Sequence, residues 1–175
     1  MEAQTRSWST AALLSVCAIL VLALAPISSP ADSMADFCNG TNGAAPQAMQ
    51  NAAASKKSVN DGRYATGKQQ AIALEKAADQ CIAAHQEPHT WAYLHAWGAM
   101  VEAQARLALG DASGTALMQK AIKEAQAYVD DPQADRDLRK LAKDIVYGGR
   151  LELKRYETAK PGEVINFTPP PTAPP

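Results

Sequence analysis

Apolar residues recur at intervals of three and four through the middle of the chain, which is the spacing of amphipathic helices. Clusters of Asn, Asp, Gly and Pro interrupt this pattern and divide it into five segments. We therefore expect helices at residues 47–59, 63–85, 91–109, 113–130 and 132–156. Because every element expected from the pattern is helical, the sequence predicts an all-α fold built from antiparallel helical hairpins.

The third of these segments, from Trp91 to Leu109, is apolar around most of its circumference. A helix of this kind has apolar residues on more than one face, so we expect it to lie between neighbouring helices. Its polar positions include Glu102 and Arg106, which are four residues apart in the favourable order. They predict an ion pair along the polar side of the helix, worth at most about 0.5 kcal/mol.

Three aromatic residues near the start of the same helix, Trp91, Tyr93 and Trp97, mark the densest apolar region of the chain. Trp and Tyr are common in the energetic centres of protein interfaces, so these side chains are candidates for binding a partner in a groove. Packing in the core is the alternative, because large aromatic side chains also dominate protein interiors.

An acidic cluster precedes the fifth helix. Asp131 followed by Pro132 is a typical helix start, since a carboxylate satisfies free backbone amides and proline suits the first turn. We interpret two of the residues in this cluster as helix caps in preference to catalytic carboxylates; its members are Asp130, Asp131, Asp135 and Asp137. Further along this helix, the pair at 148–149 consists of two glycines and is expected to kink or interrupt it.

The helices also show an internal similarity. One turn falls near residues 60–64 and another near 109–112, each followed by an Ala-rich helix and then a proline. The triplets 75–77 and 119–121 recur at an offset of 44 residues. Over residues 46–157 this arrangement resembles the helix-turn-helix repeat of tetratricopeptide proteins. The resemblance implies stacked hairpins that bind another protein, whereas a four- or five-helix bundle is the alternative.

The N-terminal part of the chain has the features of an export signal. Between Arg6 and Asp32 there is no charged residue, and the stretch 11–25 is an apolar run of the length that a signal peptide needs. Small residues at Ser33 and Ala35 predict cleavage after position 35. The mature protein would then be periplasmic or secreted. Retention of residues 8–25 as a membrane anchor is the alternative.

Cleavage would remove Cys17 and leave two cysteines. An even number of cysteines in an oxidising compartment predicts a disulfide, here between Cys38 and Cys81. Two unpaired thiols are the alternative. The bond would tether the Gly- and Asn-rich segment 36–45, expected to be a loop, to the second helix.

Charge and composition limit the classes of function that we expect for this protein. Residues 36–175 contain 16 Lys and Arg against 16 Asp and Glu, and this balance does not point to nucleic acid. The segment 158–175 is rich in proline and is expected to be a disordered tail that samples polyproline II conformations. We expect no cofactor and no enzymatic activity, since we find no nucleophile motif, phosphate-binding loop or zinc-protease motif.

One group of residues has the chemistry of metal ligands. His85, His89 and His95 lie close in sequence, and Cys81 is one helical turn before the first of them. Against a metal site stand the disulfide expected at Cys81, the polar turn around His89 and the expected solvent-exposed position of His95.

These observations predict an exported, non-catalytic helical protein that binds another protein. A helical bundle that holds a metal or small ligand near Cys81, His85, His89 and His95 is the alternative function.

Overall fold

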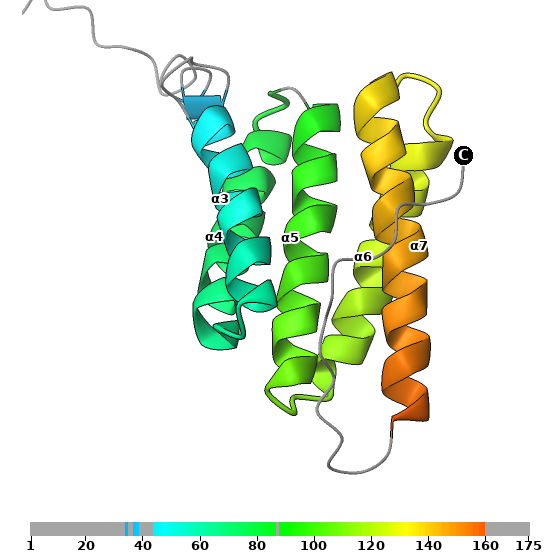
Figure 1. The fold of residues 1–175 in the computed structure, drawn as a ribbon. Helices are drawn as coiled ribbons and strands as arrows, with labels where there is room; N and C mark the ends of the chain where they lie inside the picture. The colour runs from blue at the N-terminus through cyan, green and yellow to red at the C-terminus, as the bar shows by residue number, and fades with distance from the viewer. Residues whose placement is uncertain (1–33, 35–36, 39–43, 87, 160–175) are drawn as a thin grey trace, which may run out of the picture.

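The computed structural model describes residues 34, 37–38, 44–86 and 88–159. All of its regular elements are α-helices, and each helix runs antiparallel to the next (Figure 1). The elements are α3 (Ala44–Asn60), α4 (Tyr64–Ala83), α5 (Pro88–Ala108), α6 (Ser113–Asp130) and α7 (Arg136–Thr158). The predicted all-α class is confirmed. The apolar run 11–25 and the chain beyond residue 159 lie outside the described residues.

Helix α5 occupies the middle of the molecule, between the α3–α4 hairpin and the α6–α7 hairpin (Figure 1). It packs against each of the other four helices. Its apolar side chains are buried around most of its circumference, as expected for a helix with neighbours on all sides. The largest of those that are completely enclosed are Trp91, Leu94, Met100 and Val101.

Small residues allow the helices to approach closely. A Cβ atom added at Gly67 of α4 would lie 2.7 Å from the Val59 side chain of α3, and one added at Gly114 of α6 would lie 2.7 Å from the Leu107 side chain of α5. A side chain at position 67 or at position 114 could not be accommodated without a shift of the neighbouring helix. Glycine at these positions therefore sets the distance between paired helices.

The helices α4 and α6 bury equivalent positions. When Gly67 is aligned with Gly114, the buried residues of the two helices match one for one; they are Gly67, Ala71, Leu74, Ala78 and Cys81 against Gly114, Met118, Ala121, Ala125 and Tyr128. The turn glycines Gly62 and Gly110, both at positive φ, fall at nearly equivalent places in this alignment. In this alignment Gly67 corresponds to Gly114, an offset three residues longer than the 44 residues that separate the sequence triplets.

The start of α7 differs from the prediction. The helix begins at Arg136, where the Asp135 side chain accepts hydrogen bonds from the backbone amides of Asp137 and Leu138. Asp131 instead accepts from the amide of Gln133 in the preceding turn, 2.8 Å away. Capping is thus confirmed for Asp135 but not for Asp131, and the helix starts later than residue 132.

The glycine pair in α7 does not interrupt the helix, contrary to the prediction. A Cβ atom at Gly149 would lie 2.8 Å from the Ile122 side chain of α6 and 3.3 Å from the sulfur of Met118. The contact with α6 offsets the low helix propensity of glycine, because packing outweighs an intrinsic cost of about 1 kcal/mol. The glycine allows close packing of α7 against α6.

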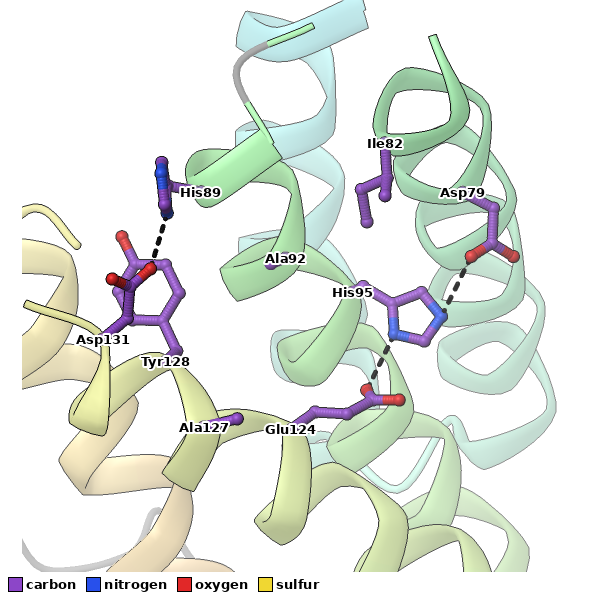
Figure 2. Close-up of a pocket in the computed structure, with 9 residues that line it drawn as sticks. All are labelled: Asp79, Ile82, His89, Ala92, His95, Glu124, Ala127, Tyr128 and Asp131. Carbon is purple, nitrogen blue, oxygen red and sulfur yellow. Dashed lines mark hydrogen bonds and ion pairs between the residues drawn. The ribbon is translucent and has the colours of Figure 1, made fainter. Parts of the chain in front are cut away.

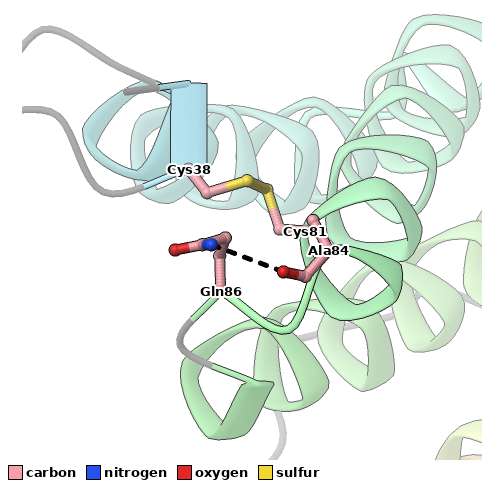
Figure 3. The surroundings of a disulfide bond; sticks show 4 residues. All are labelled: Cys38, Cys81, Ala84 and Gln86. Carbon is pink, nitrogen blue, oxygen red and sulfur yellow. Dashed lines mark hydrogen bonds between the residues drawn. A yellow bond between two sulfur atoms is a disulfide. The ribbon is translucent and has the colours of Figure 1, made fainter. Parts of the chain in front are cut away.

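A disulfide joins Cys38 to Cys81, with a Cα–Cα distance of 5.7 Å (Figure 3). Both cysteines are buried. The predicted pairing is confirmed, but the backbone of Phe37 and Cys38 is helical where a loop was expected. The bond ties this short segment to the last turn of α4, next to Gln86, whose side-chain amide donates to the carbonyl of Ala84. Among the described residues, no helix is both long and apolar enough to span a bilayer.

A buried polar row connects the three helices α3, α5 and α7. Lys56 donates to Oε1 of Gln104 at 2.8 Å, and Nε2 of Gln104 donates to both carboxylate oxygens of Glu152, at 2.7 and 2.6 Å. Burial lowers the pKa of Lys56, and burial raises the pKa of Glu152 although the charge of Lys56 opposes that rise. The neutral amide thus links two buried opposite charges.

Candidate functional site

A cavity of about 420 Å³ opens between α4 and α6, with α5 as its floor (Figure 2). We call it the histidine cavity, because two histidines of α5 lie in it. The residues that line it are Asp79, Ile82, His89, Ala92, His95, Glu124, Ala127, Tyr128 and Asp131. Its volume falls in the range of roughly 300–1,000 Å³ that is common for ligand pockets.

Helical spacing explains how three separate segments supply this lining. On α5 the floor residues His89, Ala92 and His95 are three apart, so they follow one another along neighbouring turns. On α4, Asp79 and Ile82 have the same spacing and form one wall. The small side chains at Ala92 and at the facing wall leave the space that larger residues would fill.

His95 connects the two walls of the cavity. Its Nδ1 lies 2.8 Å from Oε2 of Glu124 on α6, and its Nε2 lies 3.4 Å from Oδ1 of Asp79 on α4 (Figure 2). The two carboxylates approach the ring from opposite sides. The side chain of His95 is only 12% exposed. The expectation that His95 faces solvent is therefore wrong, because α4 and α6 enclose α5 at this position.

The electrostatics of this arrangement favour a charged imidazole. The hydrogen bond to Glu124 raises the pKa of His95, although burial opposes the rise. Burial acts to raise the pKa of Glu124, but the hydrogen bond to His95 and the charge of that ring outweigh it and the pKa is lowered. Both shifts stabilise an ion pair of His95 with Glu124 at the cavity floor.

A second histidine–carboxylate pair lies at the end of the cavity near the start of α5. His89 Nδ1 is 3.0 Å from Oδ2 of Asp131, and the side chains are 43% and 32% exposed (Figure 2). Tyr128 of α6, which is buried, lines the cavity beside this pair. The cavity therefore has one enclosed and one open histidine, each held by a carboxylate.

Two glutamates meet next to the histidine cavity. Burial, together with a hydrogen bond to Glu102 and the charge of that residue, raises the pKa of Glu75 to about 8. Glu75 is accordingly protonated at neutral pH and donates to Glu102. The two helices come close enough because residue 98 is glycine: a Cβ atom there would lie 2.8 Å from Cγ of Glu75.

Glu102 also binds Arg106, whose Nε lies 2.6 Å from Oε1 of Glu102. The glutamate side chain is 7% exposed. The pair predicted from the sequence is present, but the expectation that it follows the polar side of the helix is wrong, since α4 covers Glu102. Arg106 further donates to Asp111 at 2.9 Å and to Ser113 at 3.1 Å, across the turn into α6.

A second, shallower cavity of about 540 Å³ continues along α5 and α6; its lining residues are Glu102, Arg106, Ser113, Ala116, Leu117 and Lys120. Lys120 lies 3.6 Å from Oε1 of Glu124, which lines the histidine cavity. This ion pair joins the two cavities. We refer to the histidine cavity and the second cavity together as the α5 groove.

The aromatic residues proposed as partner-binding candidates lie elsewhere. Trp91 and Tyr93 are buried, with 0% and 5% exposure. Trp97 is half-buried, and its indole N–H donates to the backbone carbonyl of Ala52 at 3.2 Å. These residues pack among α3, α5 and α6, which agrees with the alternative of core packing. They do not line the α5 groove.

The residues considered as metal ligands do not come together. Cys81 is part of the disulfide, and His85 is exposed at the end of α4 with a positive φ of 55°. His89 and His95 belong to separate carboxylate pairs. Across the described part of the chain, no three His, Cys, Asp or Glu residues are placed to hold a metal ion.

The site that the structure reveals was missed at the sequence level, except for its two histidines. Asp79, Glu124 and Glu75 are charged residues on helices with many such residues, and nothing in their local spacing distinguishes them. The only available signal was the short interval between His89 and His95 on an otherwise apolar helix. The histidine cavity combines the carboxylates of Asp79, Glu124 and Asp131 with apolar residues, and such an arrangement is suited to binding.

The chain matches no protein-family model, no curated protein and no solved structure.

Proposed function

We propose that this protein is an exported, non-catalytic binding protein that engages a partner protein through the α5 groove. The observation that carries the proposal is the histidine cavity, which is open at the surface, floored by α5 and walled by α4 and α6. Grooves between packed helices are common sites for peptide segments of partner proteins.

The internal correspondence of the helices supports this proposal. The α3–α4 and α5–α6 hairpins have turn glycines and buried positions at equivalent places. We interpret them as two related hairpins of a tetratricopeptide-like stack, completed by α7. Stacked hairpins expose a continuous surface along their helices and act mainly by binding other proteins.

Export is supported by the disulfide. A buried Cys38–Cys81 bond is consistent with an oxidising compartment, because cytosolic thiols are kept reduced. Together with the apolar run at 11–25, it favours a periplasmic or secreted protein. Sequencing the N-terminus of the purified native protein tests this part of the proposal. A mature chain that starts near Asp36 supports export with cleavage, whereas a start at Met1 contradicts it.

The alternative of a metal or small-ligand protein centred on Cys81 is less well supported. Its four residues are divided among a disulfide, an exposed helix end and two different ion pairs. The cavity itself, by contrast, continues into a second cavity along α5, which suits a linear segment of polypeptide.

Site-specific photo-cross-linking tests the groove as an interface. A photoreactive amino acid at Ala127, which is exposed and lines the histidine cavity, should form an adduct with one reproducible partner in the native envelope or secreted fraction. The matched control is Ala53, an exposed alanine on α3. It should form no such adduct.

A blocking variant sharpens the test. Ala92→Phe places a larger side chain on the cavity floor and should abolish the adduct at position 127 without unfolding the protein, as checked by circular dichroism. Equal adducts at positions 53 and 127, or an adduct that persists in the folded Ala92→Phe variant, would contradict a binding role for the groove.

A further inference from the structure

The histidine cavity carries an excess of negative charge. Asp79 projects from α4, Glu124 from α6, and Asp131 lies directly after the end of α6 (Figure 2). Their side chains are 69%, 31% and 32% exposed, so all three are accessible from the open side. Among the described residues that line this cavity, none is a lysine or an arginine.

These carboxylates have unused hydrogen-bonding capacity. A carboxylate group accepts up to about four hydrogen bonds. Glu124 contacts His95 and, more distantly, Lys120, and Asp79 also contacts His95. Asp131 contacts His89 and accepts a hydrogen bond from the backbone amide of Gln133. The histidines hold the carboxylates in place before any ligand arrives, which reduces the entropic cost of binding. Further charged donors can therefore be accommodated without rearranging the walls.

The rest of the lining suits an aliphatic chain. Ile82, Ala92 and Ala127 present apolar surface between the acidic groups. Lysine and arginine combine such an aliphatic stem with a cationic end, and they commonly pack the stem on apolar surface while the charge reaches a polar partner. The cavity is thus complementary in both charge and polarity to a basic side chain.

The length of the α5 groove favours a polypeptide over a small amine. From His89 to Arg106 the groove floor covers 17 residue steps, or about 26 Å at the helical rise of 1.5 Å per residue. An extended segment of about eight residues has this length. The second cavity is lined by Arg106 and Lys120, and each of these cations is already paired with a carboxylate, Arg106 with Glu102 and Lys120 with Glu124. It would receive the neighbouring residues of the same segment.

We infer that the histidine cavity receives a lysine or arginine side chain from an extended basic segment of the partner protein. The inference rests on the proposed function and specifies the chemistry of the partner at that site. Asp79 and Glu124 bind the cationic end, Asp131 contributes at the open end, and the apolar residues contact the stem.

The test uses fluorescence anisotropy with the disulfide-bonded protein and labelled synthetic peptides of about eight residues, the length that matches the groove. One peptide alternates lysine with alanine, and the control peptide has glutamine in place of each lysine. The lysine peptide should bind in saturable fashion, and the glutamine peptide should bind at least about tenfold more weakly, because it lacks the charge that pairs with the carboxylates.

Charge variants locate the binding. Asp79→Asn and Glu124→Gln should each weaken binding of the lysine peptide by about tenfold. The charge-matched controls Asp137→Asn and Glu157→Gln, at exposed positions of α7, should leave it unchanged. Since Glu124 also holds His95, the exposed Asp79→Lys variant provides a second test that keeps the closer contact of His95 with Glu124, and it should abolish binding.

Three results would overturn the inference: equal affinity for both peptides, equal effects of groove and control variants, or binding of N-acetyl-lysine methylamide as tight as that of the lysine peptide. The last would indicate a site for small amines. These failures are distinguishable from failure of the proposed function. If the adduct at position 127 forms and is blocked by Ala92→Phe while the lysine peptide does not bind, the groove is an interface for a partner of different chemistry.

Discussion

Two sets of buried polar residues lie on opposite sides of the central helix α5, and their buried charges are compensated in different ways. The row of Lys56, Gln104 and Glu152 joins opposite charges through a neutral amide and is enclosed between α3, α5 and α7. On the groove side, the two carboxyl groups of Glu75 and Glu102 do not repel each other, because Glu75 keeps its proton and is neutral.

The difference separates a structural role from a functional one. In the enclosed row, each charged group has a hydrogen-bonding partner inside the protein, so the row specifies how three helices pack. Both sides contain ionisable groups with shifted pKa values, but only on the groove side do such groups lie beside open cavities, an arrangement that is more frequent at functional sites than elsewhere. The comparison therefore supports the proposal that binding occurs on the groove side of α5, while the enclosed row has a structural role.

The largest effect is expected from breaking the enclosed row. Gln104→Leu removes the hydrogen bonds that Lys56 and Glu152 make to the amide and leaves two buried charges without their linker. The free energy of unfolding should fall by about 3–5 kcal/mol, as measured by urea denaturation. The matched control is Gln126→Leu, which removes an exposed hydrogen bond to Asp130 and should change stability by less than about 0.5 kcal/mol.

Equal small losses in both glutamine variants would contradict a structural role for the row. A rescue experiment adds precision: adding Lys56→Met and Glu152→Met to Gln104→Leu removes both stranded charges. The triple variant should recover much of the lost stability, because replacing a buried ionic group by apolar residues is often neutral or favourable.

A smaller, pH-dependent effect is expected at Glu75. Its pKa of about 8 in the folded protein is above the ordinary value of 4.5, so the folded state binds the proton more tightly than the unfolded state. This contribution to stability is complete below pH 4.5 and is lost as the pH rises through about 8. Glu75→Gln should flatten the decline in stability over that interval, measured by urea denaturation at a series of pH values.

The exposed Glu157→Gln variant serves as the control and should give a pH curve parallel to that of the unchanged protein. If the Glu75→Gln curve is also parallel, Glu75 does not share a proton with Glu102. The two sides of α5 would then differ less than their charges suggest.

The smallest effects are expected in the titration of His95, followed by NMR. The hydrogen bond to Glu124 is the main cause of its raised pKa, and the charge of the more exposed Asp79 contributes less. Glu124→Gln should therefore lower the pKa of His95 more than Asp79→Asn does, and Asp137→Asn should not change it. The contribution of His95 to stability is complete below pH 6.5 and is lost as the pH rises past its raised pKa. The contribution of Glu124 is complete above pH 4.5 and is lost as the pH falls past its lowered pKa, so the ion pair stabilises the fold between these limits.

The reverse order, with Asp79→Asn producing the larger decrease, would show that the ring is held mainly by α4. His95 would then mainly hold Asp79 of α4 in place and not Glu124 of α6. Glu124 would be the carboxylate that remains available to a cationic ligand.

Much of the fold could be predicted from local sequence features. The periodic apolar residues located the helices of the described chain, and the even number of cysteines after residue 35 predicted the Cys38–Cys81 bond. The central position of α5 followed from its apolar circumference. The errors concern residues 37–38, Gly149 and the start of α7. At Gly149, contact between helices overrides local preference, whereas the start of α7 is set by the Asp135 cap.

The candidate site was not predictable in the same way. His95, Asp79 and Glu124 belong to three different helices, and Glu75 and Glu102 belong to two. Each of these residues is ordinary in its own helix. Their meeting depends on the distance between helices, which is set partly by Gly98 at the contact between α4 and α5.

Sequence alone determined the helices, the disulfide and the middle position of α5, because periodicity, capping and cysteine number act within one segment or through a simple count. Only the tertiary structure decided which charges are buried, which share a proton and where a cavity remains open. The physical reason is that the free energy of a charge depends on its solvation and on neighbours from other helices, and neither is encoded at the position of the residue itself.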